Sequence, residues 1–167
     1  MGSLSSISVL TKGIKKNDEY MTPKYAWTDI KKFLPKDKII WEAFYGDGTS
    51  GQHLRDMSLN VIHEDRDFFD TPPDYDLIVS NPPFSKTREI LIRLVELDKP
   101  FILIMPSSKI NYKYFQDIFR DKNIQLIIPK RRIHFLSEKL KEKASNCYFD
   151  CFYYVYKMNL ERDIIFL

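Results

Sequence analysis

Nine residues, Asp76-Leu77-Ile78-Val79-Ser80-Asn81-Pro82-Pro83-Phe84, decide the fold of this chain. A short apolar run ends here in an asparagine followed by two prolines, which is an unusual way to end a strand. Each proline has a fixed φ and no N–H, so the loop is stiff and rich in acceptors. A stiff pair of acceptors beside an aromatic ring suits one task well, namely holding the exocyclic amino group of a flat base.

On both sides of this stretch, apolar runs alternate with segments of helical spacing. That alternation predicts an α/β fold with a mostly parallel sheet, whose last strand turns antiparallel. Ligands of such sheets bind beyond the carboxyl ends of the strands. The expected strands cover residues 39–43, 60–63, 76–80, 101–105, 124–128 and 147–158, and the expected helices 22–33, 53–57, 86–97 and 112–119, with Thr22 as N-cap and Pro23 in the first helical position of the first helix.

Composition limits the class of protein. The 167 residues fit one domain, and a net charge of +3 permits contact with nucleic acid without demanding it. No apolar run reaches the length of a membrane span, and the first ten residues do not resemble a secretory signal. The only cysteines, Cys147 and Cys151, indicate a reducing, cytoplasmic environment in which both thiols pack in a strand region. Their spacing to His134 matches no zinc pattern, so we expect no metal, and residues 1–17 are expected to form a flexible arm.

Three of the five glycines lie within six positions, at 46, 48 and 51, directly after an expected strand. Close glycines allow a tight turn and let a ligand approach the backbone, although a plain strand-to-helix turn explains them equally well. The pattern is not that of a phosphate-binding loop. Instead Glu42 stands just before the turn, where a carboxylate suits a cationic or amine-bearing ligand.

The second expected strand ends in the acidic stretch His63-Glu64-Asp65-Arg66-Asp67. A carboxylate in this place commonly receives ribose hydroxyls, and Asp65 is the candidate, with Glu64 behind it. The alternative is a solvated charged turn. Phe68-Phe69-Asp70 then offers either an apolar wall and an acceptor for an adenine ring, or ordinary core residues.

These segments together resemble the S-adenosylmethionine-dependent adenine-N6 DNA methyltransferases, in particular those of phages and viruses. The segment 42–48 follows the family's D-P-F-x-G-x-G pattern with Glu for Asp and Ala for Pro, and Asn81-Pro82-Pro83-Phe84 matches its [DNS]-P-P-[YFW] loop without departure. Residues 18–23 resemble the segment that folds against the methionine part of the cofactor. The resemblance covers roughly residues 18 to 158, and the combination at this spacing is specific.

The resemblance implies a Rossmann-like class I methyltransferase fold and transfer of a methyl group to the N6 amino group of adenine in DNA. It implies the catalytic residues Asn81, Pro82, Pro83 and Phe84, and an S-adenosyl-L-methionine site formed by Tyr20, Thr22, Glu42, Phe44, Gly46, Gly48, Asp65 and Phe68. Two other functions stay open. The same loop presents amino groups of RNA or of a protein glutamine, and a non-catalytic subunit that needs a partner is the second alternative.

Two departures from the family pattern matter. Only ten residues separate Asp65 from Asp76, too few for the helix and third strand of a complete family sheet. Residues 18–167 are therefore expected to form a single domain, reduced around the third strand and without a separate target-recognition domain. Specificity must then come from loops, a second copy or a partner. The best loop is 129–135, continuing to Lys143, where Lys130, Arg131 and Arg132 are candidates for phosphate contact and a solvated hairpin is the alternative.

Overall fold

The structure, a computed structural model, describes residues 20–137, 140–143 and 149–167. The arm predicted over residues 1–17 and the thiol of Cys147 lie outside the described residues. The helices of the described part are too short or too polar to span a bilayer.

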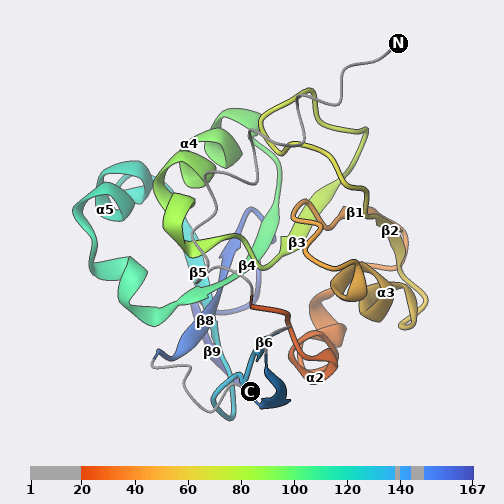
Figure 1. Cartoon of the computed structure of the whole chain (residues 1–167). Coiled ribbons are helices and arrows are strands. Elements are labelled where there is room, and N and C mark those ends of the chain that lie inside the picture. Colours follow the sequence, from red (N-terminus) through yellow and green to blue (C-terminus); the bar gives the residue numbers. More distant parts are fainter. Residues whose placement is uncertain (1–19, 138–139, 144–148) are drawn as a thin grey trace.

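A seven-stranded sheet in the order β2-β1-β3-β4-β8-β5-β9 forms the centre of the molecule (Figure 1). Neighbouring strands from β2 to β4 are parallel, β8 is antiparallel to both β4 and β5, and β5 is parallel to β9. This confirms the predicted Rossmann-like α/β fold with a mostly parallel sheet. The strands are β1 (Ile39–Trp41), β2 (Asn60–Ile62), β3 (Leu77–Ser80), β4 (Phe101–Pro106), β5 (Ile124–Ile128), β8 (Cys151–Tyr156) and β9 (Ile164–Phe166), with a separate two-stranded sheet of β6 (Leu136–Ser137) and β7 (Leu140–Lys143).

The sequence predicts that the last strand is antiparallel. In the structure the antiparallel strand β8 is followed by one more strand, β9. β8 is shorter than the predicted run, and β9 follows it and adds a further parallel strand at the edge beside β5. The three residues of β9 come after a charged stretch, Glu161-Arg162-Asp163, and carry too little periodic signal to be assigned from sequence.

The sheet is reduced where the sequence predicted it. Between Ile62 at the end of β2 and Leu77 at the start of β3, the chain forms only turns and bends. β2 is therefore an edge strand, and the chain passes straight from it to β3 on the other side of β1.

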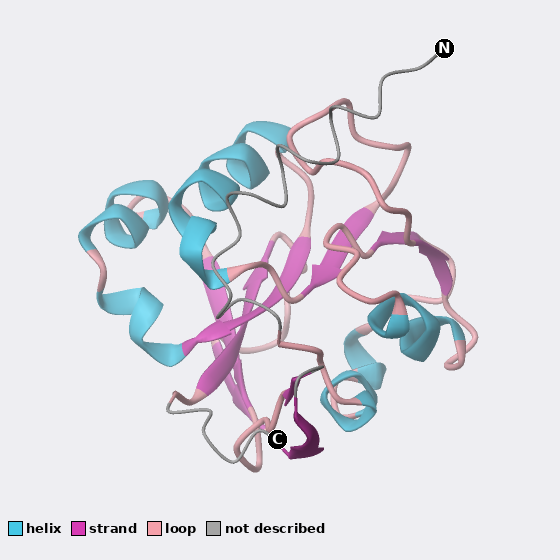
Figure 2. Cartoon of the chain, viewed as in Figure 1, coloured by secondary structure: helices cyan, strands magenta, loops and turns pink. Residues whose placement is uncertain are grey.

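Helices cover both faces of the sheet (Figure 2). Helices α2 (Lys24–Thr28) and α3 (Thr49–Arg55) pack on one face, and α4 (Thr87–Leu97) and α5 (Lys113–Phe119) on the other. Alternate residues of β4 divide between the two cores: Ile102 and Ile104 join the α2 side, whereas Phe101, Leu103 and Met105 join the α4 side. Burial on both faces explains why β4 reads as a continuous apolar run.

The first helix is shorter than predicted. The α-helix spans Lys24–Thr28 with Pro23 as its N-cap, so the expectation that Thr22 caps the helix and Pro23 begins it was wrong. Ile30 leaves the helical region, with φ −104° and ψ 8°, and a 3-10 helix at Lys31–Phe33 follows. The extended Leu34 before Pro35 ends the segment, as the residue before a proline usually does. Two more 3-10 helices, η2 (Phe84–Lys86) and η3 (Ser107–Asn111), follow β3 and β4.

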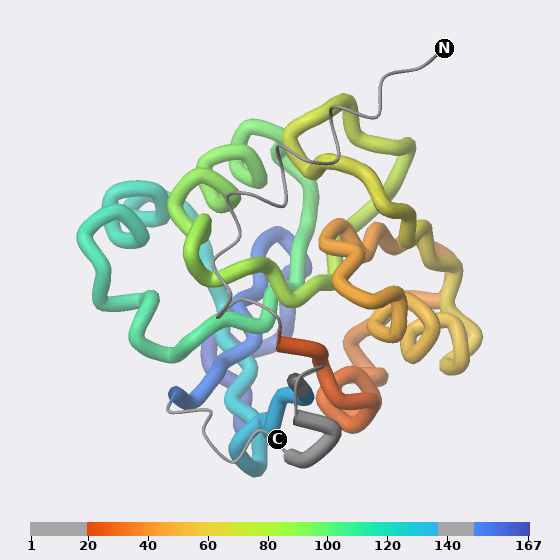
Figure 3. Tube along the Cα trace, in the orientation of Figure 1, coloured from red at the N-terminus to blue at the C-terminus, as the bar shows by residue number. Residues whose placement is uncertain are grey.

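The start of the described chain lies against the segment that follows β5 (Figure 3). Met21 and Leu136 exchange two backbone hydrogen bonds, with N–O distances of 2.8 and 2.9 Å. This antiparallel bridge joins the residues before α2 to the loop that leaves β5, and it brings both beside the loop that follows β3.

Candidate active site at the carboxyl edge of the sheet

Both motifs identified in the sequence lie at one edge of the sheet. Strands β1, β2 and β3 are parallel, so the turn after β1, the acidic stretch after β2 and the N-P-P-F loop after β3 emerge at their carboxyl ends. This edge is where open α/β sheets bind their ligands.

The N-P-P-F loop is held from two sides. It passes through η2 into α4, and the Phe84 carbonyl accepts a hydrogen bond from Thr87 Oγ1 at 2.8 Å. Lys109 Nζ in η3, after β4, donates to the same carbonyl at 3.2 Å. The loop is therefore fixed both to its own helix and to the loop that leaves the neighbouring strand.

Asn81 has one half of its amide engaged and the other half free. Its Nδ2 donates to the Tyr20 carbonyl at 3.2 Å. Its Oδ1 is buried and has no hydrogen-bond partner among the described residues. Because a carbonyl only accepts, it fixes the amide with nitrogen toward Tyr20 and leaves the oxygen available. A buried acceptor without a partner costs about 1–3 kcal/mol, which a ligand N–H would recover.

Aromatic rings surround the ring of Phe84. Tyr20 lies nearly parallel to it, with ring centroids 6.4 Å apart and an interplanar angle of 23°. Phe135 and Phe149 meet it edge-on at 6.2 and 5.2 Å. The ring of Phe84 is half-buried in this aromatic cluster (Tyr20, Phe84, Phe135 and Phe149), which joins four distant segments of the chain.

The glycine turn has the backbone conformation that the sequence predicted. Gly46 and Gly48 have φ values of +60° and +86°, which residues with a Cβ rarely adopt. A Cβ on Gly46 would lie 3.3 Å from the Met21 sulfur, so the turn packs closely against the N-terminal segment. Asp47 then accepts hydrogen bonds from the backbone N–H and the hydroxyl of Thr49 at the start of α3.

Glu42 lies beneath this turn with its carboxylate buried. Only 1% of the residue is exposed. Its carboxylate accepts hydrogen bonds from the Ser80 hydroxyl, from the Ser50 hydroxyl at 2.5 Å and from the Phe44 N–H at 3.2 Å. Burial raises the pKa of Glu42 to about 7, against the lowering effect of these three donors. The sequence had assigned Glu42 to the amine of a ligand, and the structure places all of these contacts inside the protein.

The raised pKa predicts how Glu42 affects stability. Between pH 4.5 and about 7 the folded protein retains a proton that the unfolded chain has lost, so stability falls as pH rises through this window. Across this pH window the free energy of unfolding should fall by about 3 kcal/mol because of Glu42. In Glu42→Gln, which does not titrate, that fall is expected to disappear. Urea unfolding of both proteins at about pH 5 and about pH 8 measures it as a difference of differences, in which other carboxyl groups cancel. Equal pH dependence in the two proteins would contradict the assignment.

The other predicted cofactor residues differ in exposure. Asp65 is exposed after β2 and makes no hydrogen bond or ion pair with the part of the chain that the structure describes, whereas Glu64 pairs with Arg66 at 2.6 Å. Thr22 is buried. Phe68 is 4% exposed and packs on Phe44, with ring centroids 4.8 Å apart. It therefore belongs to the core and contacts the glycine turn through Phe44.

The predicted phosphate-contacting residues differ in their freedom. Arg132 pairs with Asp150 through two hydrogen bonds of 2.6 and 3.1 Å, and Arg131 lies over the Tyr25 ring and pairs with Asp29 at 3.6 Å. Lys130 is exposed and has no ion pair within the described ranges. The two arginines thus join the loop after β5 to the flanks of α2 and β8, whereas Lys130 forms no such pair with the residues that the structure describes.

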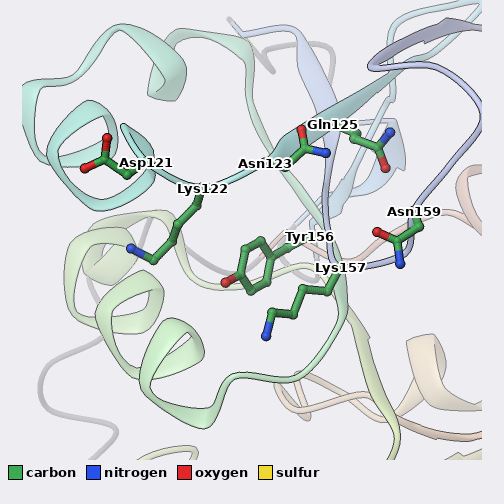
Figure 4. A pocket seen from close by; sticks show the side chains of 7 residues that line it. All are labelled: Asp121, Lys122, Asn123, Gln125, Tyr156, Lys157 and Asn159. Carbon is green, nitrogen blue, oxygen red and sulfur yellow. The ribbon is translucent and has the colours of Figure 1, made fainter.

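A hollow of about 240 Å³ lies at the opposite edge of the sheet (Figure 4). It lies beside the start of β5 and the end of β8 and is lined by Asp121, Lys122, Asn123, Gln125, Tyr156, Lys157 and Asn159. None of the residues predicted for the site lines it. Among the described residues, no three His, Cys, Asp or Glu side chains come together to hold a metal ion.

Sequence reasoning missed three parts of this site. The Tyr20 carbonyl is a backbone group and leaves no mark in the sequence. Ser80 does have a sequence signal, because it is the single polar residue at the end of an apolar strand. Phe135 also has a sequence signal, since it ends the basic loop that the sequence predicts at this edge of the sheet.

The sheet order, the glycine turn after β1 and the N-P-P-F loop after β3 define the class as Rossmann-like methyltransferases. The profile of the family described as adenine-specific methyltransferase EcoRI matches residues 47–148, more than half of the chain. The chain belongs to this family, which confirms the resemblance to adenine methyltransferases.

Two individual proteins are similar to the chain. The Type II methyltransferase M.EcoRI of Escherichia coli is 34% identical over 76 residues, which are 42% of this chain and 23% of that protein. The chain thus spans less than a quarter of its relative. A solved structure of a provisionally assigned methyltransferase from Thermoplasma acidophilum matches 88% of this chain and 79% of its own, with 12% identity and a TM-score of 0.37.

Proposed function

We propose that this protein transfers a methyl group from S-adenosyl-L-methionine to the N6 amino group of adenine in DNA. The observation that carries the proposal is the Asn81 amide at the start of the N-P-P-F loop, whose oxygen has no hydrogen-bond partner in the part of the chain that the structure describes. Membership of an adenine-specific methyltransferase family supports the substrate.

The chemistry follows from what an aromatic amine needs. Its lone pair is delocalised into the ring, so the nitrogen is a poor nucleophile. With one N–H donated to Asn81 Oδ1 and the other to the Pro82 carbonyl, the nitrogen becomes more tetrahedral and its lone pair is released. Phe84 stacks on the base, which is worth roughly 1–3 kcal/mol.

When bound, the cofactor supplies an electrophilic methyl group on a sulfonium. A bond forms between N6 and the methyl carbon while the carbon–sulfur bond breaks, and its electron pair stays on sulfur. The methylated nitrogen then loses one proton, so no base is needed before the attack. Most of the rate gain comes from alignment of the reacting atoms. In duplex DNA the base must leave the stack to reach the loop.

The glycine turn and its neighbours suit the proposed cofactor. Gly46 and Gly48 let a ligand approach the backbone, and the exposed Asp65 carboxylate offers acceptors for ribose hydroxyls. Tyr20, Thr22, Phe44 and Phe68 complete the proposed site, with Glu42 at its base. Two further features stay predictions. One is that the protein is of phage or viral type, and the other is that it works as a homodimer or with a specificity partner.

Methyl transfer from labelled S-adenosyl-L-methionine to unmethylated DNA tests the proposal, with Asn81→Ala as its partner variant. Label in N6-methyladenine that disappears in the variant supports it. Label only on RNA or protein would redirect the function to those amino groups. No binding of the cofactor in a titration would instead favour a non-catalytic subunit.

The loop after β5 yields a prediction for DNA binding. Lys130→Ala is expected to weaken DNA binding for all sequences and to lower the slope of log affinity against log salt by about one, because one phosphate contact is lost. Lys122→Ala, at the opposite edge of the sheet, is the matched control and should leave the slope unchanged. Fluorescence anisotropy at several salt concentrations measures both. Equal slopes for the two variants would exclude Lys130 as a phosphate contact.

A further inference from the structure

The Glu42 carboxylate joins three parts of the proposed site. One oxygen accepts hydrogen bonds from the Ser80 hydroxyl and the Phe44 N–H, and the other from the Ser50 hydroxyl. Phe44 lies in the glycine turn and Ser50 in the first turn of α3. Ser80 is the last residue of β3, directly before Asn81. The cofactor turn and the catalytic loop thus meet at one buried side chain.

The contacts of Glu42 leave little room for another role. The Ser50 oxygen is itself fixed by Trp27 Nε1, which donates to it at 3.1 Å. The residue is 1% exposed, and its carboxylate makes no ion pair with the described residues. His63, which follows β2, contacts the backbone of Glu42. His63 Nδ1 lies 3.0 Å from the Glu42 backbone carbonyl, and burial lowers its pKa, so the ring is neutral at physiological pH.

The protonation state of Glu42 decides the direction of these hydrogen bonds. An ionised carboxylate only accepts and so receives all three donors. A protonated carboxyl donates its own hydrogen, so one of the two serine oxygens must then accept from Glu42 and point its hydroxyl hydrogen elsewhere. Because the pKa lies at about 7, both states occur within the physiological pH range.

We propose that Glu42 is a positioning residue, which aligns Asn81 with the glycine turn through Ser80 and does not itself contact the cofactor. The inference rests on the proposed methyl transfer. The sequence suggested that Glu42 binds the amine of the cofactor. The proposed role is instead to fix the position of the N-P-P-F loop relative to the glycine turn.

The test compares Glu42→Gln, Ser80→Ala and the double variant, and Thr28→Val serves as a control that removes a hydroxyl from outside the network. Each single change in the network is expected to lower kcat roughly tenfold, because one charge-assisted hydrogen bond is lost and Asn81 shifts. The dissociation constant for S-adenosyl-L-methionine should stay within about twofold. The double variant should be no slower than the slower single variant, since both changes break one link.

A pH profile adds a readout that a purely structural role would not move. The wild-type kcat should rise with pH through about 7 as Glu42 ionises, and this step should be absent in Glu42→Gln. The ¹⁵N signal of the Asn81 side-chain amide should shift in both network variants and not in Thr28→Val. That signal needs no substrate and isolates the positioning effect from methyl transfer.

Three results would overturn the inference. One is a large loss of cofactor affinity in Glu42→Gln with kcat unchanged, which would make Glu42 a direct ligand. The second is additive losses in the double variant, and the third is an unmoved Asn81 signal. Failure of the proposed function looks different, because the wild-type protein itself would then leave DNA unmethylated while the Asn81 signal still reports on Glu42.

Discussion

Asn81→Asp is expected to lose methyl transfer at neutral pH and to recover part of it in acid. Aspartate keeps an acceptor in place of Asn81 Oδ1 but turns a second acceptor toward the Tyr20 carbonyl, where the wild type has an N–H donor at 3.2 Å. Two acceptors repel each other, so the side chain should rotate away and kcat should fall on the order of a hundredfold. A protonated carboxyl donates to the carbonyl and restores the arrangement, which favours activity below about pH 5.

The measurement is the ratio of variant to wild-type kcat at each pH, so that the pH dependence of the rest of the protein cancels. Asn81→Ala is the control. Its side chain has neither the acceptor nor the donor. At every pH its kcat should therefore stay on the order of a hundred- to a thousandfold below the wild-type kcat. If Asn81→Asp had wild-type activity at neutral pH, the Tyr20 carbonyl would not require an N–H donor at position 81. Cofactor affinity, measured by titration, should be the same in all three proteins.

Gly51→Ala is expected to destabilise the protein by about 1–3 kcal/mol, although alanine is the better helix former. A Cβ at Gly51 in α3 would lie 2.2–2.6 Å from the His63 side chain. That ring has no room to retreat, because it stacks on Tyr45 with centroids 4.8 Å apart and holds the Glu42 carbonyl at 3.0 Å. The clash should therefore push α3 away from β2 and disturb the turn that leads into the helix.

Urea unfolding measures this loss, and Gln52→Ala, one residue along the same helix and exposed, is the matched control with an expected change within about 0.5 kcal/mol. A second test uses the partner residue. In a His63→Ala background the ring is gone, so the further change Gly51→Ala should cost much less. An equal cost in both backgrounds would place the strain elsewhere.

The sequence predicted the sheet and its motifs because those depend on local patterns. Runs such as Phe101–Met105 are apolar throughout because both faces of the strand are buried, and Asn81-Pro82-Pro83-Phe84 can be recognised wherever it occurs. The short interval between Asp65 and Asp76 also predicted the reduced sheet from length alone. These signals need no knowledge of which segments meet.

The contacts that complete the site could not be predicted in this way. Tyr20 and Asn81 are 61 positions apart, and their bond joins a backbone carbonyl to a side chain, so no residue type announces it. The sequence predicts a role for Glu42 at a ligand amine, but it does not reveal the burial of this residue beneath the turn, which is a tertiary property. The pairs of Arg131 with Asp29 and of Arg132 with Asp150 also could not be predicted, because they join separate segments of the chain.

The position of β8 in the sheet determines when β5 can join the sheet during synthesis of the chain. β4 and β5 do not pair with each other, and each pairs with β8, which the chain forms after both. A nascent chain that ends before Cys151 therefore carries the whole N-P-P-F loop but has no strand through which β5 joins the sheet. The loop after β5, with Leu136 and Phe135, then has no fixed place beside Tyr20. Because pairing between segments that are distant in the chain is slow, the Met21–Leu136 bridge and the aromatic cluster around Phe84 are expected to form only after β8 has been synthesised.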